Sequence, residues 1–225
     1  MKIKIATWNI NSIRLRENHV CSVLVDYAPD IICLQELKAA TESVPTKKFE
    51  DLGYKYLVIR GQKGYNGVAI ISRIPIVDTG HFDYCLKGDA RHVSAILPNG
   101  VEIQNFYIPA GGDVADRKLN MKFGHKLDFL SEMKANFREK KLVKTILDGD
   151  LNIAPLEIDV WNHKQLTKVV SHTPIEIDAL KSVLMAGDFV DITRKDLPDG
   201  LLYSWWSYRS PNWVTSDRGR RLDHI

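Results

Sequence analysis

Acidic and amide side chains follow three apolar segments of this 225-residue sequence, where those segments end. The ends are WNIN at residues 8–11, LQE at residues 34–36 and LDGDLN at residues 147–152. In open α/β sheets, ligands gather beyond the carboxyl ends of strands, so groups distant in sequence can meet there. Oxygen ligands in this number suit Mg²⁺, which takes one or two protein carboxylates and completes its shell with water and substrate phosphate. The pattern therefore predicts a magnesium site at these segment ends.

Each of these side chains, taken alone, also has a purely structural interpretation. Asn9 and Asn11 could cap the helix that is expected to follow them. Glu36 and Asp150 could be solvated loop acids. Three separate segments that end in the same way favour a functional site over three coincidences.

Strands and helices must alternate along the chain to place these side chains. Apolar periodicity predicts strands at residues 2–8, 30–35, 56–60, 68–72, 93–97, 101–107, 143–147 and 203–208, and from residue 221 onward. Helices are expected at residues 12–27, 115–140 and 174–186. Several strands are apolar on both faces, which implies sheets that are covered on both sides. We expect one α/β domain over residues 1–225.

Composition narrows the class of protein less than the motifs do. The formal net charge of +3 is a mild basic bias, so an anionic partner must be met by a local patch. Cys21, Cys33 and Cys85 leave one cysteine unpaired in any disulfide scheme, which suits a reducing compartment. The first residues lack the layout of a signal peptide, and no apolar run reaches the roughly 20 residues of a membrane span. We expect a cytoplasmic protein without a membrane partner.

Six short segments, taken in order, resemble one known family. They are WNIN at 8–11, QELK at 35–38, GVAI at 67–70, NFYIP at 105–109, GDLNIAP at 149–155 and RLD at 221–223. The chain resembles, over its whole length, the exonuclease III family of apurinic/apyrimidinic (AP) endonucleases, in the endonuclease/exonuclease/phosphatase superfamily. The resemblance implies a four-layered α/β sandwich of two packed mixed β-sheets flanked by helices. It also implies hydrolysis of DNA phosphodiesters with Mg²⁺, for which Mn²⁺ is a possible substitute.

The resemblance gives roles to the residues at the strand ends. It makes Glu36 the carboxylate that binds the metal. Asn9 and Asn11 are expected in the hydrogen-bond network that positions the metal and the phosphate. Lys38 is expected immediately behind these groups. The catalytic roles that the resemblance implies are a phosphate contact for Tyr107, control of the attacking water for Asp150 and Asn152, and orientation of a histidine for Asp223.

Contacts to DNA are expected from a second group of residues. The resemblance assigns this role to Tyr65, Arg91, Trp205 and Leu222, with Trp205 in the pocket that receives the baseless sugar. A basic stripe is also expected on the helix at residues 115–140, although a solvated helix face explains the same cations. Its members would be Arg117, Lys118, Lys122 and Lys126.

Two departures from the family pattern carry expectations of their own. Ala110 stands where the family places Asn or Gln, so a phosphate contact is expected to be missing there. Neighbouring side chains on a strand face opposite ways, so Asp223 and His224 are not expected to enter one site. The family histidine lies in a Ser-Asp-His unit that this sequence lacks. We therefore expect His224 to be structural, and the catalytic histidine and one or two final strands to lie beyond Ile225.

The leading hypothesis is an abasic-site endonuclease that also removes 3′ nucleotides and 3′ blocking groups, acting as a monomer on double-stranded DNA with abasic sites or 3′ ends. One alternative is another phosphodiesterase of the superfamily, acting on phosphoinositides, sphingomyelin or RNA. A second alternative, for the chain as it stands, is a DNA-binding module without catalysis.

Overall fold

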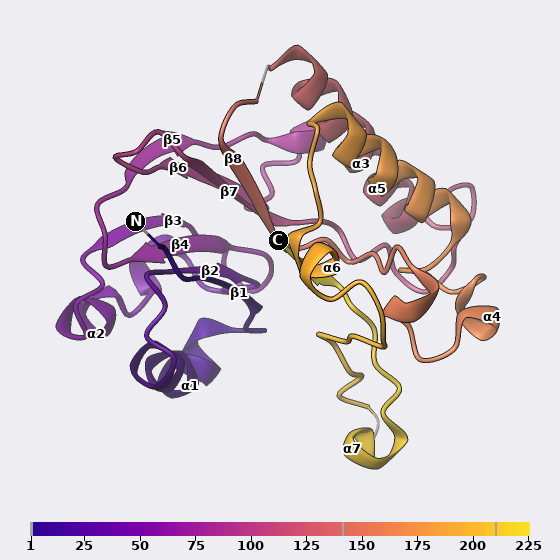
Figure 1. Ribbon diagram of the computed structural model, residues 1–225, viewed down its shortest axis with the longest axis horizontal. Helices are drawn as coiled ribbons and strands as arrows, with labels where there is room; N and C mark the ends of the chain where they lie inside the picture. The colour runs from indigo at the N-terminus through magenta and orange to yellow at the C-terminus, as the bar shows by residue number, and fades with distance from the viewer. Residues whose placement is uncertain (1, 141, 210) are drawn as a thin grey trace. The chain divides into compact units, whose positions relative to one another are not determined.

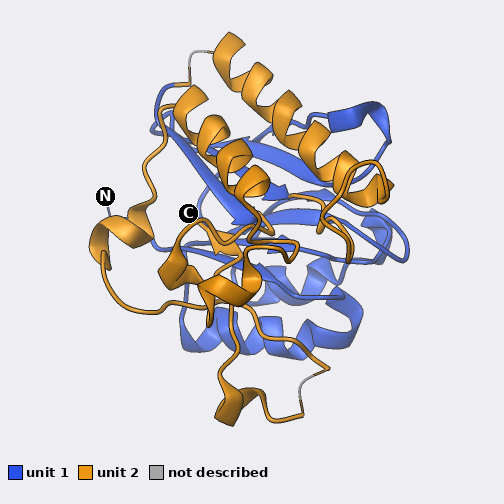
Figure 2. Ribbon diagram, turned by 90° about the vertical axis from the view of Figure 1, so that its right-hand side faces the viewer, with its two compact units in different colours: residues 1–107, 143–150 blue, residues 108–142, 151–225 orange. Residues whose placement is uncertain are grey.

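Two β-sheets form the centre of the first of two units into which the chain divides (Figure 2). The computed structural model describes residues 2–140, 142–209 and 211–225. Unit 1 comprises Met1–Tyr107 and Val143–Asp150, and unit 2 comprises Ile108–Leu142 and Leu151–Ile225. The strand ends that carry the acidic and amide side chains at residues 8–11, 34–36 and 147–150 lie in unit 1.

The first sheet has the strand order β1-β2-β4-β3 (Figure 1). Its strands are β1 (Ile5–Asn9), β2 (Ile31–Gln35), β4 (Val68–Ser72) and β3 (Tyr56–Arg60). Every residue of β2 and β4 is buried, because these central strands are covered on both faces. β1 runs parallel to β2, and Asn9 pairs with Gln35 at the carboxyl end of both strands. This register brings Asn9 and the residue after Gln35 to the same edge of the sheet.

The second sheet of unit 1 contains β5 (Val77–Gly80), β6 (His92–Ile96), β7 (Glu102–Tyr107) and β8 (Thr145–Asp150), in that order. β6 and β7 are antiparallel, and a turn joins them in which Gly100 has a φ of 80°. β7 and β8 are parallel, and Tyr107 pairs with Asp150 at their carboxyl ends. Both sheets thus contain parallel and antiparallel strand pairs. In each sheet, polar side chains lie at the carboxyl ends of the parallel pair.

Apolar side chains from both sheets form the core of unit 1. Val58 and Ile70 from the first sheet pack with Val93 and Ile103 from the second. The outer face of the first sheet is covered by α1 (Ile13–Asp26) and α2 (Thr46–Asp51), and Phe49 of α2 is fully buried there. Two 3₁₀ turns, Thr41–Ser43 and Tyr84–Leu86, lie in the connections.

Two long helices pack against each other in unit 2 (Figures 1 and 2). They are α3 (Met121–Glu139) and α5 (Pro174–Ala186). Asn120 caps α3 by accepting from the backbone of Lys122, and Thr173 begins α5 in a capping box with Glu176. The shorter elements are the 3₁₀ turn Glu157–Asp159, α4 (His163–Leu166), α6 (Ile192–Asp196), α7 (Trp213–Ser216) and β9 (Asp223–His224).

A buried ionic cluster stabilises the last residues of unit 2. Asp159, which is fully buried, accepts hydrogen bonds from Arg194 at 2.6 Å and from Arg221 at 2.8 Å. Arg221 also pairs with Asp191 at 2.6 Å. Arg221 is 1% exposed, so its positive charge faces these carboxylates and not the solvent. Arg221, the first residue of the RLD motif, therefore stabilises the fold.

Most predicted elements are present, and the differences have identifiable causes. Residues 203–208 are not a strand, because only Trp205 makes a bridge there, with Arg220. The predicted helix at 115–140 begins later, at Met121, because Asn120 takes the cap. The short edge strand β5 was missed, because its mostly polar sequence lacks alternation. Among the described residues, no helix is both long and apolar enough to cross a membrane.

The predicted basic stripe is wrong at three of its four positions, because Arg117 and Lys118 lie before α3 begins at Met121 and Lys126 is buried on it. The side chain of Lys126 is fully buried and pairs with Glu176 at 2.5 Å, so it presents no charge to DNA. Helical spacing placed Lys126 with the other cations, but the apolar residues Phe123, Leu127 and Leu130 around it belong to the buried face.

Candidate active site

Four side chains from four strand ends converge in unit 1. The Asn9 side chain donates to Glu36 Oε1 at 2.9 Å and to Asp150 Oδ2 at 2.8 Å. The Tyr107 hydroxyl donates to the same Glu36 oxygen at 2.8 Å. Asn9 and Asp150 are separated by 141 positions in the sequence, so the fold alone brings them together. The predicted convergence of Asn9, Glu36 and Asp150 is present, and Tyr107 joins them.

The local backbone explains how these side chains reach one point. Glu36 has a φ of 55°, a conformation that turns the chain sharply as it leaves β2. Gly149 precedes Asp150 with a φ of 133°, and a Cβ there would lie 2.0 Å from the Phe106 carbonyl oxygen. Only glycine fits this close approach of β8 to β7. The Gly-Asp dipeptide of the motif therefore reflects backbone packing as well as chemistry.

Lys38 brings a positive charge to the same cluster. Its ammonium lies 2.6 Å from Glu36 Oε2 and 2.5 Å from the side-chain oxygen of Asn11. The two oxygens thus face a common point that already attracts a cation. Carboxylate and amide oxygens of this kind are the donor set that Mg²⁺ prefers, so Glu36 and Asn11 fit a divalent metal ion.

The Asn9 side chain has a defined orientation. Its side-chain oxygen accepts from the backbone N–H of Asn11 at 3.0 Å, and its nitrogen is the atom that faces the carboxylates. Asn9 therefore orients Glu36 and Asp150 through its nitrogen, and its role at a metal stays a prediction. The capping alternative for Asn9 is wrong, since the helix cap position is Ser12.

The hydrogen bonds around Glu36 decide its charge. Burial acts to raise the pKa of Glu36, but donation from Asn9, Lys38 and Tyr107 outweighs burial, and the pKa lies below its ordinary value. Glu36 is therefore ionised at neutral pH. Burial, followed by the negative charges of Glu36 and Asp150, raises the pKa of Tyr107 well above its ordinary value. Tyr107 therefore keeps its proton and remains a hydrogen-bond donor.

A buried polar layer fixes the strands beneath the site. Gln35 donates to Asn105 at 2.7 Å and to Thr7 at 3.0 Å. Asn105 in turn donates to the carbonyl oxygens of Leu34 and Ala69, so one side chain of the second sheet is bonded to two strands of the first. Gln35 and Asn105 belonged to the motifs but had no predicted role. Their structural role could have been inferred from a polar residue inside an apolar strand.

Arg91 lies beside the site, and Tyr65 lies on the surface. The Arg91 guanidinium stacks 4.9 Å from the centre of the Tyr107 ring and pairs with Asp89 at 3.1 Å. Tyr65 is 61% exposed on the loop before β4. The predicted DNA contact is compatible with both positions.

Four further residues of the predicted site, Asn152, Trp205, Leu222 and Asp223, belong to unit 2. Asn152 is buried, with its side chain donating to the Ile108 carbonyl at 2.9 Å. The backbone of Asp223 donates to the Ser204 hydroxyl at 3.0 Å. Leu222 is 5% exposed and packs in an apolar cluster that includes Trp205, so its predicted DNA contact does not fit its burial.

His224 has the structural environment that was predicted for it. It is buried, and its Nε2 lies 2.8 Å from the Ile153 carbonyl oxygen. Burial, assisted by the neighbouring charge of Arg221, lowers the pKa of His224 to about 4. The ring is therefore neutral at physiological pH and serves the packing of unit 2.

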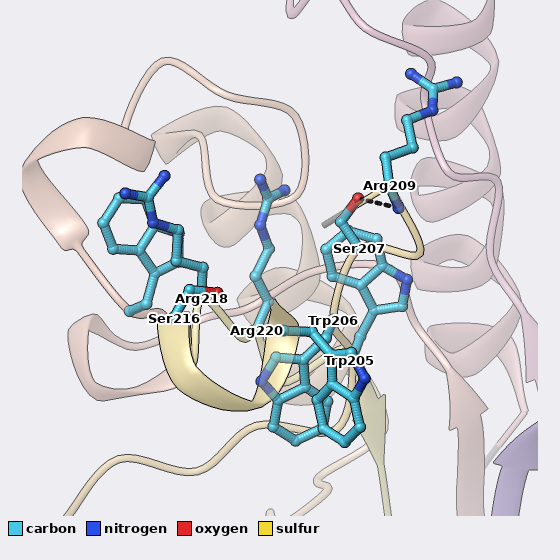
Figure 3. A pocket seen from close by; sticks show the side chains of 9 residues that line it. Trp205, Trp206, Ser207, Arg209, Ser216, Arg218 and Arg220 are labelled. Atoms are coloured by element: carbon cyan, nitrogen blue, oxygen red, sulfur yellow. Dashed lines mark hydrogen bonds between the residues drawn. The ribbon is translucent and has the colours of Figure 1, made fainter. Parts of the chain in front are cut away.

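A pocket of about 360 Å³ in unit 2 surrounds Trp205 (Figure 3). Its walls are aromatic and basic. The tryptophans and arginines that line it are Trp161, Trp205, Trp206, Trp213, Arg209, Arg218 and Arg220. Arg220 lies over the Trp205 ring at 5.5 Å, and Arg218 lies over Trp161 at 4.7 Å. The sequence pointed to Trp205, but the contributions of Trp161 and Arg218 were missed because they depend on tertiary contacts. Trp206 also lines this pocket.

The matches to known proteins agree with this fold and site. A model of the endonuclease/exonuclease/phosphatase family matches residues 6–225, and the chain belongs to this family of metal-dependent nucleases. Within the family, it is similar to exodeoxyribonuclease III from Haemophilus influenzae, at 30% identity over 238 residues covering 99% of this chain and 86% of that protein. The predicted resemblance is confirmed.

Solved structures give the same result. The chain is similar to an AP endonuclease from Archaeoglobus fulgidus, with a TM-score of 0.91, 32% identity and coverage of 100% of this chain and 86% of that one. It is also similar to the 3′ phosphatase NExo from Neisseria bound to a product DNA hairpin, with a TM-score of 0.90, 31% identity and coverage of 100% and 86%. The predicted α/β fold of two mixed sheets with flanking helices is confirmed, and the chain is an exodeoxyribonuclease III-like nuclease.

Proposed function

We propose that this protein is a Mg²⁺-dependent DNA repair nuclease that hydrolyses the phosphodiester 5′ to abasic sites. We propose that it also removes nucleotides or blocking groups from 3′ ends of duplex DNA, as a monomer. The observation that carries the proposal is the bonding of one Asn9 amide to both Glu36 and Asp150. Two carboxylates held together beside a cation and a protonated phenol suit phosphodiester hydrolysis. The similar AP endonuclease and exodeoxyribonuclease support DNA as the substrate.

Each residue of the site has a part in this chemistry. Asp150 accepts a hydrogen bond from the attacking water and takes its proton as the oxygen bonds to phosphorus. Tyr107, which keeps its proton, turns its hydroxyl from Glu36 to donate to a phosphate oxygen when DNA binds, and Arg91 beside it neutralises backbone charge. The bond from phosphorus to the 3′ oxygen breaks, and that oxygen takes a proton from solvent water, which leaves a 3′ hydroxyl and a 5′ phosphate. The resemblance supports Asn152 and Asp223 as further catalytic residues.

A divalent metal would be held by Glu36 and Asn11, the two residues whose oxygens converge on the Lys38 ammonium. When bound, the metal supplies positive charge to the phosphate as negative charge develops on its oxygens. Asn9 keeps Glu36 and Asp150 oriented for both tasks. Lys38 neutralises part of the charge of Glu36.

Cleavage of an abasic-site duplex is expected to depend on Mg²⁺ and on Glu36. Glu36→Ala removes the ionised carboxylate and should raise the Mg²⁺ concentration that gives half-maximal cleavage by about tenfold or more, given the role of carboxylates in binding this ion. Magnesium titrations of wild type and variant measure the effect. Undiminished wild-type cleavage in excess EDTA would contradict the proposed metal dependence.

Trp205→Ala is expected to reduce discrimination for abasic DNA more than general duplex binding. The pocket around Trp205 is proposed to take the extruded baseless sugar, which is easier to extrude because no base must be unstacked. Loss of a central aromatic contact typically costs about 2 kcal/mol, or about 30-fold in affinity. Binding of abasic and intact duplexes should be compared for Trp205→Ala and Arg91→Ala. Equal losses on both duplexes for Trp205→Ala would assign Trp205 to the core alone.

Ala110→Asn is expected to tighten substrate binding without changing the rate of the chemical step. Ala110 is exposed, and an amide there could donate one hydrogen bond to a phosphate, worth about 0.5–1.5 kcal/mol. A contact made equally in ground state and transition state changes KM more than kcat. Single-turnover rates at saturating DNA should therefore be equal for variant and wild type. A large rate gain at saturation would show that the contact acts in the transition state.

A further inference from the structure

A fully buried ion pair lies in unit 2, directly behind the backbone of Asn152. Lys126 of α3 and Glu176 of α5 are both 0% exposed, and Lys126 Nζ lies 2.5 Å from Glu176 Oε1. Burying two charges is costly, and apolar residues of similar volume often replace such pairs without loss of stability. The pair therefore calls for an explanation other than stability.

Lys126 is bonded to both chain segments that leave the strands of the site. Its ammonium donates to the carbonyl oxygen of Asn152 at 2.7 Å, and it lies 3.4 Å from that of Ala110. Ala110 belongs to the segment that follows Tyr107, and Asn152 is two residues after Asp150. Gly111 makes room for the lysine, since a Cβ there would lie 3.0 Å from Lys126 Cδ.

Glu176 holds the other side of the same arrangement. Its carboxylate accepts from the backbone N–H of Ser171 at 3.0 Å and from the Thr173 hydroxyl at 2.6 Å. The carbonyl oxygen of Ser171 accepts from the backbone of Ala154 at 2.8 Å. Glu176 therefore fixes Lys126 directly and fixes Ala154 through Ser171. Residues 152–154 are held at both ends.

Two hydrogen bonds hold Asn152 in a left-handed backbone conformation, which asparagine adopts more readily than most residues do. Its φ is 54°, in the left-handed region that costs most residues energy. Its carbonyl is fixed by Lys126, and its side chain is fixed by the bond to the Ile108 carbonyl. With both ends of the residue bonded, the direction of the Asn152 amide is set. A loss of either bond would free that amide to turn.

We propose that Lys126 and Glu176 are positioning residues for the nuclease reaction, acting by holding the backbone of Asn152. The inference rests on the proposed function, in which Asn152 helps to control the attacking water. Lys126 and Glu176 themselves touch neither DNA nor metal in this account. They act on the rate of the chemical step through Asn152.

The test uses the double variant Lys126→Met/Glu176→Gln in the full chain. This variant keeps the side-chain volumes and leaves no unpaired buried charge, but it removes the donor to the Asn152 carbonyl. Single-turnover cleavage of an abasic-site duplex should fall by about 10²-fold, because small misplacements of catalytic groups have effects of that size. DNA affinity should change by less than about threefold. Arg138→Met, at an exposed position on α3, is the matched control and should keep the wild-type rate.

Combination with Asn152→Ala separates positioning from a general structural defect. If the pair acts through Asn152, the rate of the triple variant should equal that of Asn152→Ala alone. A triple variant that is slower than Asn152→Ala by the full factor seen in the double variant would overturn the proposal. A wild-type rate in the folded double variant would also overturn it. If the double variant does not fold, Lys126→Arg replaces it, since arginine keeps the charge but moves the donors. The rate should then fall in a variant whose folding is verified by circular dichroism, and an unchanged rate would overturn the proposal.

Hydrogen exchange gives a readout that does not depend on activity. The backbone amides of residues 152–154 should exchange faster in the double variant than in wild type, while those of α1 should not change. Equal exchange at residues 152–154 would overturn the proposal. If wild type cleaves none of the DNA substrates, the proposed function fails, and hydrogen exchange alone decides whether the pair holds this segment.

Discussion

Asp150→Asn is expected to lower the single-turnover rate of phosphodiester cleavage by about 10²–10⁴-fold, the usual contribution of a general base. Asparagine has the size of aspartate and can still bond to Asn9, but it cannot take a proton from water. The fold should therefore survive while the chemistry is lost. Because Glu36 is retained, the Mg²⁺ concentration for half-maximal cleavage should change less than in Glu36→Ala.

The measurement is single-turnover cleavage of an abasic-site duplex at saturating enzyme. Asp78→Asn, at an exposed position on β5, is the matched control and should cleave at the wild-type rate. DNA affinity should be equal in wild type and Asp150→Asn, or slightly higher in the variant, because one negative charge beside the phosphate is gone. A rate for Asp150→Asn within about threefold of wild type would exclude Asp150 as the base.

Asp148→Asn is expected to change how stability depends on pH. Asp148 is fully buried, and burial raises its pKa to about 8, against about 3.9 for an unfolded aspartate. Contacts with Cys33 and Thr7 lower the pKa, but by less than burial raises it. Between these two values the folded protein holds one more proton than the unfolded chain. The free energy of unfolding must therefore fall as pH rises from about 4 to about 8, by up to about 6 kcal/mol.

Asparagine at position 148 cannot ionise, so this contribution should vanish. Denaturant unfolding of wild type and Asp148→Asn at about pH 5 and about pH 8.5 measures it. The stability of the variant relative to wild type should increase by several kcal/mol at the higher pH. His224, whose pKa is lowered to about 4, contributes an opposite slope that cancels in this difference. A difference that is independent of pH would show that Asp148 does not stay protonated in the folded protein.

The side chains at the strand ends could be predicted because they depend on local pattern and connection rules. The apolar runs before Asn9, Glu36 and Asp150 predict strands. Parallel strands bring their carboxyl ends to the same edge of a sheet. Their detailed bonding could not be predicted. The direction of the Asn9 amide depends on the backbone N–H of Asn11, which periodicity does not reveal.

The buried charges of unit 2 could not be predicted from the sequence. Lys126 was interpreted by charge, which favours solvent or DNA, yet it is buried against a carboxylate distant in sequence. Arg221 had no predicted role apart from its place in the RLD motif, and it too is buried against such a carboxylate. The partners, Glu176 and Asp159, give no local signal of these pairings. Leu222, which the resemblance assigns to DNA, packs in an apolar cluster, and its contact with DNA stays a prediction. Charge pattern alone does not separate an ion pair inside the fold from a binding surface.

The most direct test of the proposed function is incision of a DNA duplex that carries a single abasic site. The product ends should be identified by mass spectrometry. The account predicts Mg²⁺-dependent cleavage 5′ to the site that leaves a 3′ hydroxyl and a 5′ deoxyribose phosphate, because water attacks phosphorus and the 3′ oxygen leaves. Asp150→Asn should yield almost none of this product. No incision, a 3′ unsaturated aldehyde in place of the hydroxyl, or full incision by Asp150→Asn would contradict the account.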